Sequence, residues 1–390
     1  MNIVIVGRFS PPILSCMRSW GRNSHKVGFV CIDGDMGLKP CSRYLDIQMN
    51  LPQSEVYKNN GISRISRFLK RFDADVLSCI DDNIACWLSD NAFQLDNKIS
   101  VAFPSSQMIK KILSKAQQNA IATKVGLKVL PEYLIDNDNI ERISIAPEHF
   151  PMCLRPSAPH DVTPFFKVKL VHSTIELKQF IQTIHITQKI IGQPFKNLPN
   201  LVIHGIRSQN GDTKLMSAFM IQRKFEGVTL TLQPYPDLPE ELIDKCTAFV
   251  QSFDLIGNFH FEFLFDPETS EAFFLEINLR FGGTTAKVLA CGYDEPMYAL
   301  EAFGIVKSYG KPVVQDIVVT NKQAILKYIG KALKNSLTEL DYPNESVWER
   351  IFFGIKGFFR FKDEVMTVDD IRGSVSLYGN NAINIFKKIF

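Results

Sequence analysis

The chain has little of what marks membrane proteins, zinc-binding domains and disulfide-rich secreted proteins. No hydrophobic run among its 390 residues approaches the ~20 residues that a membrane-spanning helix needs. Its eight cysteines are scattered and form no C-x-x-C pair, which indicates neither a zinc ribbon nor a disulfide framework. We therefore expect buried, reduced thiols in a reducing compartment, and a cytoplasmic protein.

A strong charge of one sign is missing as well. Lys and Arg number 44 and Asp and Glu number 41, which leaves a net charge of +3. Proteins that hold nucleic acid do so largely through an excess of cationic side chains. The balance therefore predicts small-molecule partners and no nucleic acid. The hydrophobic share of 45% is that of a folded chain, and the length predicts roughly two or three packed modules.

The N-terminal part of the chain alternates short apolar strands with helical stretches. Residues 3–6, 27–32 and 76–80 are predicted to be buried parallel strands, with a helix at 63–71 between them. The first run is interpreted as a strand and not as a signal peptide. Residues 7–12 then hold only one glycine of a dinucleotide-binding G-x-G-x-x-G motif, so no Rossmann cofactor site is predicted. This order predicts a small open α/β domain with a parallel sheet.

Mixed helical and extended patterns continue through the rest of the chain. A helix closes at Gly126, and a turn at 209–212 joins two extended segments as a hairpin. The basic-aromatic run 351–362 is predicted to form a strand pair. The other expected elements are strands within 151–171, a helix at 174–186, extended segments at about 189–195, 200–207 and 214–225, and a helix at 239–253.

The most informative stretch is a predicted hairpin. Residues 258–266 alternate strictly, with four phenylalanines on one face and polar groups on the other. A second alternating run, 272–280, follows a turn centred on Thr269. A hairpin folded about that residue places Glu262 directly opposite Glu276. The residues predicted to share one face of the second strand are Phe274, Glu276, Asn278 and Arg280.

Two facing carboxylates need a cation between them. Like charges that lie opposite each other destabilise a sheet. A hard divalent cation with oxygen ligands, Mg²⁺ or Mn²⁺, relieves that repulsion, and the Asn278 side-chain oxygen is a further ligand. Arg280 adds a fixed cation that can hold an anion beside the metal. The pattern thus predicts a metal site at Glu262, Glu276 and Asn278, with a solvated polar sheet face as the alternative that stays open.

These residues resemble the metal-binding signature of the ATP-grasp superfamily, in which one Glu precedes an E-x-N-x-R strand. Here the signature is Glu262 followed by Glu276-Ile-Asn278-Leu-Arg280-Phe-Gly-Gly. The resemblance covers about 1–305 and is closest to the carboxylate–amine ligase branch. The weaker matches upstream, in the family's order, are Ser114-Lys115 with 126–131, the strand Pro151-Met-Cys-Leu-Arg-Pro156, and the hinge-like segment Ile190-Ile-Gly-Gln-Pro-Phe195.

The resemblance implies roles for the matched residues. Lys115 and Arg155 would place cations on the phosphates of ATP. Gln193 and Phe195, in the hinge, would bind adenine, and Arg223 would hold the reacting anion. The residues by themselves leave ordinary alternatives open, namely a solvated helix lysine, a core arginine, a plain sheet strand and a surface arginine.

Three positions depart from the family's pattern. Arg155 stands where the family has a lysine, and Pro194 replaces an acidic hinge residue. Residues 157–166, which match the family's glycine-rich loop, contain no glycine. Lys167 and Lys169 are cations that can serve in place of the loop's backbone amides. A protein of this fold that binds nucleotide without turnover is compatible with these departures.

Two further signals are ambiguous. Asp81 and Asp82 follow a predicted strand, at the edge where open sheets bind ligands, but a turn cap explains them as well. His160 and His204 stand alone in the sequence and are interpreted as structural.

The fold implied by the resemblance is an ATP-grasp fold, in which two α+β subdomains clasp ATP. A small open α/β parallel-sheet domain precedes it. The implied boundaries are 1–105 for the N-terminal α/β domain, 106–305 for the ATP-grasp domain (subdomains 106–187 and 188–305), and 306–390 for a C-terminal extension packed on the core.

The implied activity is that of an ATP- and Mg²⁺-dependent (or Mn²⁺-dependent) ligase. ATP would phosphorylate a substrate carboxylate to an acyl phosphate, and an amine would then displace phosphate to give an amide, with release of ADP. Arg280 and Arg223 would hold the acyl phosphate or the carboxylate. The partners are then a small carboxylate and an amine, and a homodimer is left open. The alternatives are an ATP-binding protein of this fold without catalysis, a ligase that uses a non-amine nucleophile, and a membrane-surface protein that uses 351–362.

Overall fold

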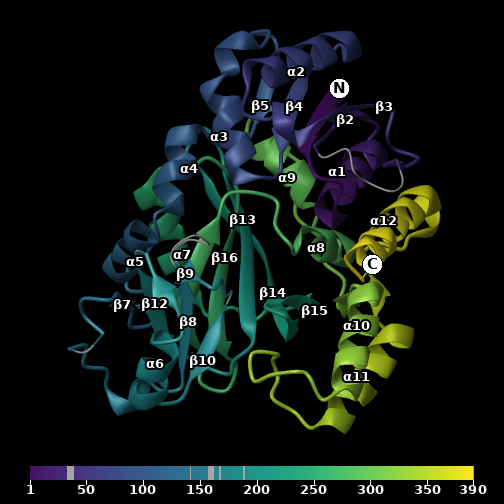
Figure 1. Ribbon diagram of the computed structural model, residues 1–390. Coiled ribbons are helices and arrows are strands. Elements are labelled where there is room, and N and C mark those ends of the chain that lie inside the picture. The colour runs from purple at the N-terminus through teal and green to yellow at the C-terminus, as the bar shows by residue number, and fades with distance from the viewer. Residues whose placement is uncertain (33–38, 141, 157–161, 167, 188, 390) are drawn as a thin grey trace. The chain divides into compact units, whose positions relative to one another are not determined.

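Two compact units make up the chain in the computed structural model (Figure 1). The smaller unit is Lys128–Leu198, and the larger one combines Met1–Leu127 with Pro199–Phe390. The domain boundaries predicted from the sequence group the residues differently, and they stay predictions. The structure describes residues 1–32, 39–140, 142–156, 162–166, 168–187 and 189–389, with side chains through residue 383.

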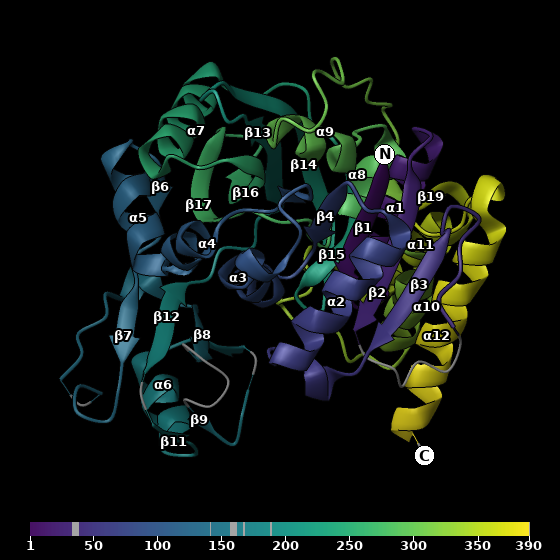
Figure 2. The same ribbon diagram turned by 90° about the horizontal axis from the view of Figure 1, so that it is seen from above.

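A parallel sheet of five strands opens the larger unit. Its strands run side by side in the order β3-β2-β1-β4-β5, which confirms the three predicted parallel strands. Figure 2 labels the first four of them. Both faces are buried, since Ile3 and Ile5 pack with α1 while Val4 and Val6 pack with α2. The elements are β1 Asn2–Gly7, α1 Pro11–Arg22, β2 Lys26–Ile32, β3 Ile47–Leu51, η1 Gln53–Glu55, α2 Asn59–Phe72, β4 Val76–Cys79, α3 Asp82–Asp90, η2 Ala92–Gln94, β5 Ser100–Ala102, α4 Ser106–Leu113 and α5 Lys115–Lys124.

A large, mainly antiparallel sheet forms the second layer of this unit, in the order β19-β18-β15-β14-β13-β16-β17. Its long strands β13, β14 and β16 are prominent in Figure 1. On one face Phe261 packs against Phe249 of α7, and on the other Val202 and Phe219 pack with α8 and α9. The elements are β13 Asn200–Arg207, β14 Thr213–Phe225, β15 Val228–Pro234, α7 Glu240–Phe253, β16 Gly257–Asp266, β17 Glu271–Asn278, α8 Thr285–Cys291, α9 Glu295–Ala302, β18 Val319–Thr320 and β19 Lys362–Asp363.

The smaller unit is built on an antiparallel sheet in the order β10-β8-β12-β7. Leu177 and Ile181 of α6 close its core over Met152 and Ile190. Residues 157–161, with His160, and Lys167 lie outside the described residues. The elements are β6 Lys128–Val129, β7 Tyr133–Ile135, η3 Pro147–His149, β8 Met152–Pro156, β9 Val162–Thr163, β10 Lys169–Val171, α6 Thr174–Ile181, β11 His185–Ile186 and β12 Ile190–Pro194.

The predicted strand pair at 351–362 is wrong, because most of this run belongs to the helix α11 (Val347–Arg360). Ser346 and Glu349 form a capping box at its start. Its two glycines, Gly354 and Gly357, face α10 (Lys322–Leu333). A Cβ at Gly354 would collide with Ile329, so the glycines allow two helices to pack closely. The last elements are η4 Val368–Asp370 and α12 Ile371–Ile389.

The three aromatic residues at the end of α11 should differ in their contribution to stability. Phe358 packs on the cluster around Ile325, and the ring of Phe361 lies 5.4 Å from that of Phe353. Phe359 is 77% exposed. We expect Phe358→Ser and Phe361→Ser each to lower the free energy of unfolding by up to about 3 kcal/mol, and Phe359→Ser to leave it unchanged. Denaturant unfolding checks this, and an equal loss in all three variants would contradict it.

A buried ion pair fastens the C-terminal segment to α1. Arg18 Nε donates to Asp370 Oδ2 at 3.0 Å, and Arg18 Nη1 donates to the carbonyl oxygen of Val365 at 2.7 Å. The side chains of Arg18 and Asp370 are 2% and 0% exposed. Residues some 350 positions apart therefore lie side by side in one core.

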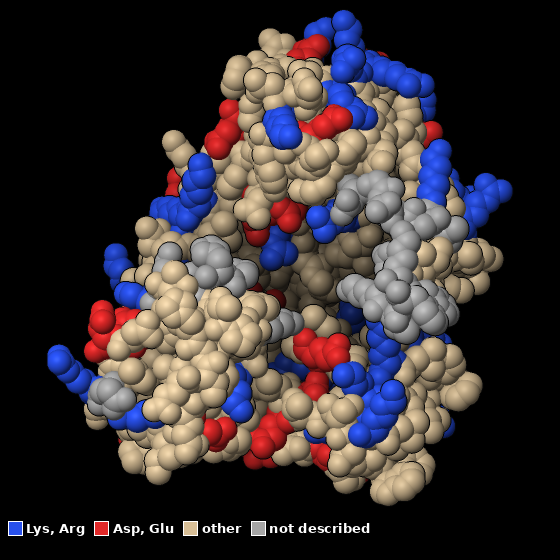
Figure 3. All heavy atoms as spheres, in the orientation of Figure 1, with Lys and Arg blue, Asp and Glu red and all other residues tan. Residues whose placement is uncertain are grey.

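Charges of both signs are interspersed over the face of the molecule drawn in Figure 3, in keeping with the net charge of +3. Among the helices that the structure describes, none is long and apolar enough to cross a bilayer. The cytoplasmic location and the homodimer stay predictions.

Candidate active site

The predicted carboxylate pair lies at the centre of the β16–β17 hairpin. The register sets Glu262 opposite Glu276 and His260 opposite Asn278, which confirms the predicted pairing. The turn at 267–270 is short, so the two strands pair directly from Asp266 and Glu271 inward. Continued without interruption, this register would place Leu275 opposite Glu262, so the β-bulge beside Glu262, and not the turn alone, brings the two carboxylates together.

A β-bulge next to the pair breaks the predicted alternation. The register shifts after Glu262, so that Phe263 pairs with Phe274. The extra residue turns Phe274 to the apolar face, where its ring lies 5.9 Å from that of Phe263 and 5.3 Å from that of Phe249. The prediction that Phe274 shares a face with Glu276 is therefore wrong, because burial of an aromatic ring outweighs strict alternation.

The electrostatics of the pair indicate a missing positive charge. Burial, and then the neighbouring Glu276 carboxylate, raise the pKa of Glu262 to about 7, although Lys115 and Arg280 act in the opposite direction. Burial and the second carboxylate therefore outweigh the effect of the two cations on the pKa of Glu262. Two carboxylates in this state, with an amide oxygen next to them, fit the ligand preferences of Mg²⁺ or Mn²⁺.

Lys115 lies beside the pair. Its Nζ is 3.6 Å from Glu276 Oε2 and also donates to the carbonyl oxygen of Leu275. Ser114 separates α4 from α5 and caps α5 through its hydroxyl, which sets Lys115 at the first position of the helix. Asn278 Nδ2 donates to Glu276 Oε1 at 2.9 Å. The structure thus gathers all three predicted metal ligands and one predicted phosphate ligand.

Arg280 follows the end of β17 in the large sheet and contacts Asp82, which begins α3 beside the five-stranded parallel sheet. Its Nε donates to Asp82 Oδ2 at 2.6 Å. Asp81 accepts hydrogen bonds from the backbone N–H groups of the next turn, so the interpretation of Asp81 as a cap is confirmed. Burial raises the pKa of Asp82 despite the opposing effect of Arg280. Asp81, Asp82, Asn258 and Arg280 line a small pocket at the carboxyl ends of β4 and β5, where open sheets bind ligands.

Three of the four predicted ATP ligands belong to the smaller unit. Arg155 lies on β8 and Gln193 on the adjacent β12, and Arg155 Nη2 donates to Gln193 Oε1 at 3.3 Å. Arg155 Nε is buried and has no hydrogen-bond partner within the described part of the chain. The backbone N–H of Phe195 donates to the carbonyl oxygen of Pro151 at 2.7 Å. An arginine with an unmatched donor is suited to an anionic ligand.

Arg223 is engaged elsewhere. Its guanidinium donates to the Tyr328 hydroxyl at 3.0 Å, pairs with Glu345 Oε2 at 2.5 Å and lies 3.7 Å above the Phe353 ring. These groups belong to the C-terminal helices and to the segment between them. The contacts favour a packing role, and the predicted role of Arg223 with the reacting anion stays a prediction.

Sequence reasoning missed the partners that lie far along the chain from the signature. Asp82 was predicted either to cap a turn or to lie at the sheet edge where ligands bind, yet it pairs with Arg280. His204 was interpreted as a lone structural histidine, yet it lies against His260 and Glu295. The sequence could have predicted the contact between His204 and His260, because each is a polar residue within an apolar strand. It gives no sign that Glu295 lies beside them.

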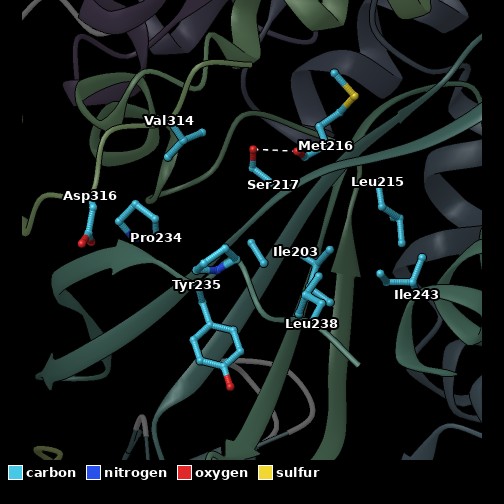
Figure 4. Close-up of a pocket in the computed structure, with 12 residues that line it drawn as sticks. Ile203, Leu215, Met216, Ser217, Pro234, Tyr235, Leu238, Ile243, Val314 and Asp316 are labelled. Atoms are coloured by element: carbon cyan, nitrogen blue, oxygen red, sulfur yellow. Dashed lines mark hydrogen bonds between the residues drawn. The ribbon is translucent and has the colours of Figure 1, made fainter. Parts of the chain in front are cut away.

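A larger pocket of about 550 Å³ lies on the opposite face of the large sheet (Figure 4). Ile203 and Leu215 line it from β13 and β14, Tyr235 follows β15, and Ile243 belongs to α7. Among its described lining residues none is a predicted site residue, and the walls are mainly apolar. The pocket is therefore separate from the candidate active site.

The raised pKa of Glu262 predicts a pH dependence of stability. Between its ordinary value of 4.5 and about 7, the folded protein holds a proton that the unfolded chain has released. The free energy of unfolding should therefore fall as pH rises through this window in the absence of divalent metal, and Mg²⁺ should reduce the loss. Denaturant unfolding of the wild type and of Glu262→Gln isolates the effect. An identical slope in both proteins would contradict it.

Comparisons with known proteins give likenesses at the level of structure. No protein-family model and no curated protein matches the chain. The N5-carboxyaminoimidazole synthetase of Staphylococcus aureus is 16% identical, with a TM-score of 0.62 over 88% of this chain and 86% of that one. A biotin carboxylase from Campylobacter jejuni is 15% identical, with a TM-score of 0.59 over 81% and 74%. An L-amino acid ligase from Bacillus licheniformis is 15% identical, with a TM-score of 0.56 over 80% and 75%. These likenesses confirm the predicted fold.

Proposed function

We propose that this chain, which has the ATP-grasp fold, is an ADP-forming ligase that activates a substrate carboxylate as an acyl phosphate and joins it to an amine. The observation that carries the proposal is the Glu262–Glu276 pair, with Lys115 beside it and Arg280 at the same sheet edge. Phosphoryl transfer needs this set of groups, namely carboxylates for a divalent metal and fixed cations for the phosphates and the acceptor.

Glu262, Glu276 and Asn278 would hold the metal, Mg²⁺ or Mn²⁺. The fit rests on the facing carboxylates and on the raised pKa of Glu262. When bound, the metal would neutralise the negative charge that develops on the transferring phosphoryl group.

The cations of the chain would position ATP. Lys115, fixed at the start of α5, would turn from Glu276 and Leu275 toward a phosphate oxygen. Arg155 would direct its unmatched Nε–H to a phosphate as well, while Gln193 keeps its guanidinium in place. Gln193 and Phe195, on the hinge strand, would bind adenine. Each cation then acts by position and charge, with no covalent chemistry of its own.

Arg280 would hold the substrate carboxylate and then the acyl phosphate. A guanidinium binds a carboxylate or a phosphate through two parallel hydrogen bonds. In the structure its Nε contact goes to Asp82, so an incoming anion would compete with that carboxylate or share the guanidinium with it. The small pocket around Asp82, Asn258 and Arg280 is then the place for the acceptor substrates.

Arg155→Ala should weaken ATP binding by about 1.5–3 kcal/mol, the value of a hydrogen bond to a charged group. The reason is that the buried Nε has no other partner among the described residues. Isothermal titration with ATP and Mg²⁺ measures the change, and Lys128→Ala, at the exposed first position of the unit, is a control. If Arg155 is instead structural, the variant will unfold at a lower temperature and still bind ATP as the wild type does.

An ADP-release assay over pools of carboxylates and amines tests the function itself. ADP that appears only when both a carboxylate and an amine are present supports the ligase. ADP that appears with a carboxylate and no amine points to a non-amine nucleophile. If ATP with Mg²⁺ raises the melting temperature but no pool releases ADP, the chain binds nucleotide without catalysis and the proposal fails.

A further inference from the structure

Two imidazoles and a carboxylate meet in the core beside the candidate active site. We call His204 on β13, His260 on β16 and Glu295 at the start of α9 the histidine cluster. Their relative exposures are 0%, 3% and 0%. His204 pairs with His260 across the two strands, and their rings are stacked with centroids 5.2 Å apart. Atoms able to ligate a metal, one from each residue, all lie within 4.8 Å of one another.

The ring nitrogens of the histidine cluster divide into two groups. His204 Nε2 lies 3.5 Å from Thr284 Oγ1, and His260 Nε2 lies 3.8 Å from Glu262 Oε1. The Thr284 oxygen can accept a proton from His204 Nε2, while the Glu262 oxygen lies beyond hydrogen-bond distance of His260 Nε2. The two Nδ1 atoms are buried without a hydrogen-bond partner within the described residues, and His204 Nδ1 lies 3.4 Å from Glu295 Oε1. With the protons on Nε2, both Nδ1 atoms present lone pairs.

The carboxylate of the cluster is held in its charged form. Glu295 accepts hydrogen bonds from Asn258 Nδ2 at 3.2 Å and from Thr285 Oγ1 at 2.7 Å. Burial acts to raise the pKa of Glu295, but the contact with His204 and the hydrogen bond from Thr285 lower it overall, and a metal ion would replace the proton through which His204 meets this carboxylate. A neutral imidazole and a charged carboxylate are the forms that ligate metals.

One atom able to ligate a metal from each of the three residues therefore lies close to the others in a space that excludes solvent. Buried polar atoms without partners are rare, and an ion or a water molecule commonly accounts for them. A proton on His204 Nδ1 would satisfy the contact with Glu295 but would leave His260 Nδ1 without a partner. The hydroxyl of Tyr293 is also buried without a hydrogen-bond partner within the described chain, and the centroid of its ring lies 5.3 Å from that of His204. A cation with a water ligand would account for all of these atoms.

We propose that the histidine cluster binds a divalent transition-metal ion, Zn²⁺ or an ion of similar chemistry, in addition to the metal at Glu262 and Glu276. Two imidazole nitrogens and one carboxylate oxygen are the ligand set of such ions, whereas Mg²⁺ prefers oxygen ligands alone. His204 Nε2 is within hydrogen-bond distance of the Thr284 hydroxyl, which is the kind of outer contact that usually orients a metal-bound imidazole.

The position of the ion gives it a structural role. It would tie two strands of the large sheet to the first residue of α9, which packs on the sheet through Tyr298 and Ala302. Because His260 also faces Glu262, the ion would fix the orientation of a predicted ligand of the active-site metal. This inference does not depend on the ligase activity.

The metal content of the purified full-length protein is the first test. We expect about one equivalent of Zn²⁺ per chain by elemental analysis after gel filtration in Mg²⁺ buffer. After removal with a chelator, titration with Co²⁺ alone should give a visible absorption band of an imidazole-ligated ion, saturating near one equivalent. The chelator should also lower the melting temperature, and Zn²⁺ should restore it.

Matched variants locate the ion. His204→Gln and His260→Gln should lose the Co²⁺ band and the Zn²⁺-dependent rise in melting temperature. His185→Gln, which removes an exposed histidine of the smaller unit, should keep both, and so should Glu276→Gln, which alters only the active-site pair. A band that His204→Gln retains, or that Glu276→Gln abolishes, would overturn the assignment.

The wild type alone can also refute the proposal, whether or not the variants fold. If it carries no transition metal, shows no Co²⁺ band and melts at the same temperature with and without chelator, the cluster holds no metal. A proton shared between His204 and Glu295 would then compensate the charge of that carboxylate.

Discussion

Glu276→Gln should lower ATP-driven turnover by orders of magnitude. The substitution keeps the size and shape of the side chain and removes one negative charge from the pair with Glu262. If the pair holds Mg²⁺, the metal loses a charged ligand, and the transition state of phosphoryl transfer loses the neutralisation that the metal provides. If the carboxylates merely face each other, the substitution relieves repulsion, stability rises slightly, and nothing else changes.

The two outcomes can be separated without a known substrate. Mg²⁺ with a non-hydrolysable ATP analogue should raise the melting temperature of the wild type by linkage, and much less that of Glu276→Gln. Glu268→Gln, in the exposed turn of the same hairpin, removes the same charge away from the pair and should behave as the wild type. Equal thermal shifts in all three proteins would refute the metal site and, with it, the ligase.

Local patterns in the sequence predicted the parts of the fold that depend on local interactions. The three apolar runs at 3–6, 27–32 and 76–80 form parallel strands, since only a sheet covered on both faces buries such runs. The alternation along the two strands predicted that Glu262 faces Glu276, although the register that produces this pair includes a β-bulge that the sequence did not reveal. Both features depend on residues within one or two neighbouring elements.

The parts that sequence reasoning missed depend on packing between distant segments. Phe274 leaves its expected face because the apolar cluster around Phe249 and Phe263 can bury it. The strand pair predicted at 351–362 failed because this run is helical. Gly354 lets the helix pack against Ile329 of α10, and the local pattern does not show that contact. The partners of Arg223, Tyr328 and Glu345, lie more than 100 residues further along the chain, so the sequence around Arg223 does not predict them.

Loss of the buried ion pair between Arg18 and Asp370, which holds the C-terminal segment against α1, should also have a large effect. Arg18→Met should lower the free energy of unfolding by about 3–5 kcal/mol, because removing one partner leaves a buried charge without compensation. Asp370 would keep hydrogen bonds from the Ser42 hydroxyl and the Arg43 backbone N–H, but it would lose its cation. Ser374, which now accepts from Arg18 Nη2, would lose that bond as well.

A control for this prediction lies one turn further along the same helix. Arg22 pairs with Asp369 at 2.8 Å, but their side chains are 39% and 34% exposed. Exposed pairs contribute about 0.2–1 kcal/mol, so Arg22→Met should cost no more than that. In the double variant Arg18→Met with Asp370→Asn, the buried charge is gone, and the loss should be smaller than in Arg18→Met alone. Denaturant unfolding of the four proteins measures the differences. Similar losses in Arg18→Met and Arg22→Met would show that burial of this pair does not set its contribution, and that α12 is held by its apolar contacts instead.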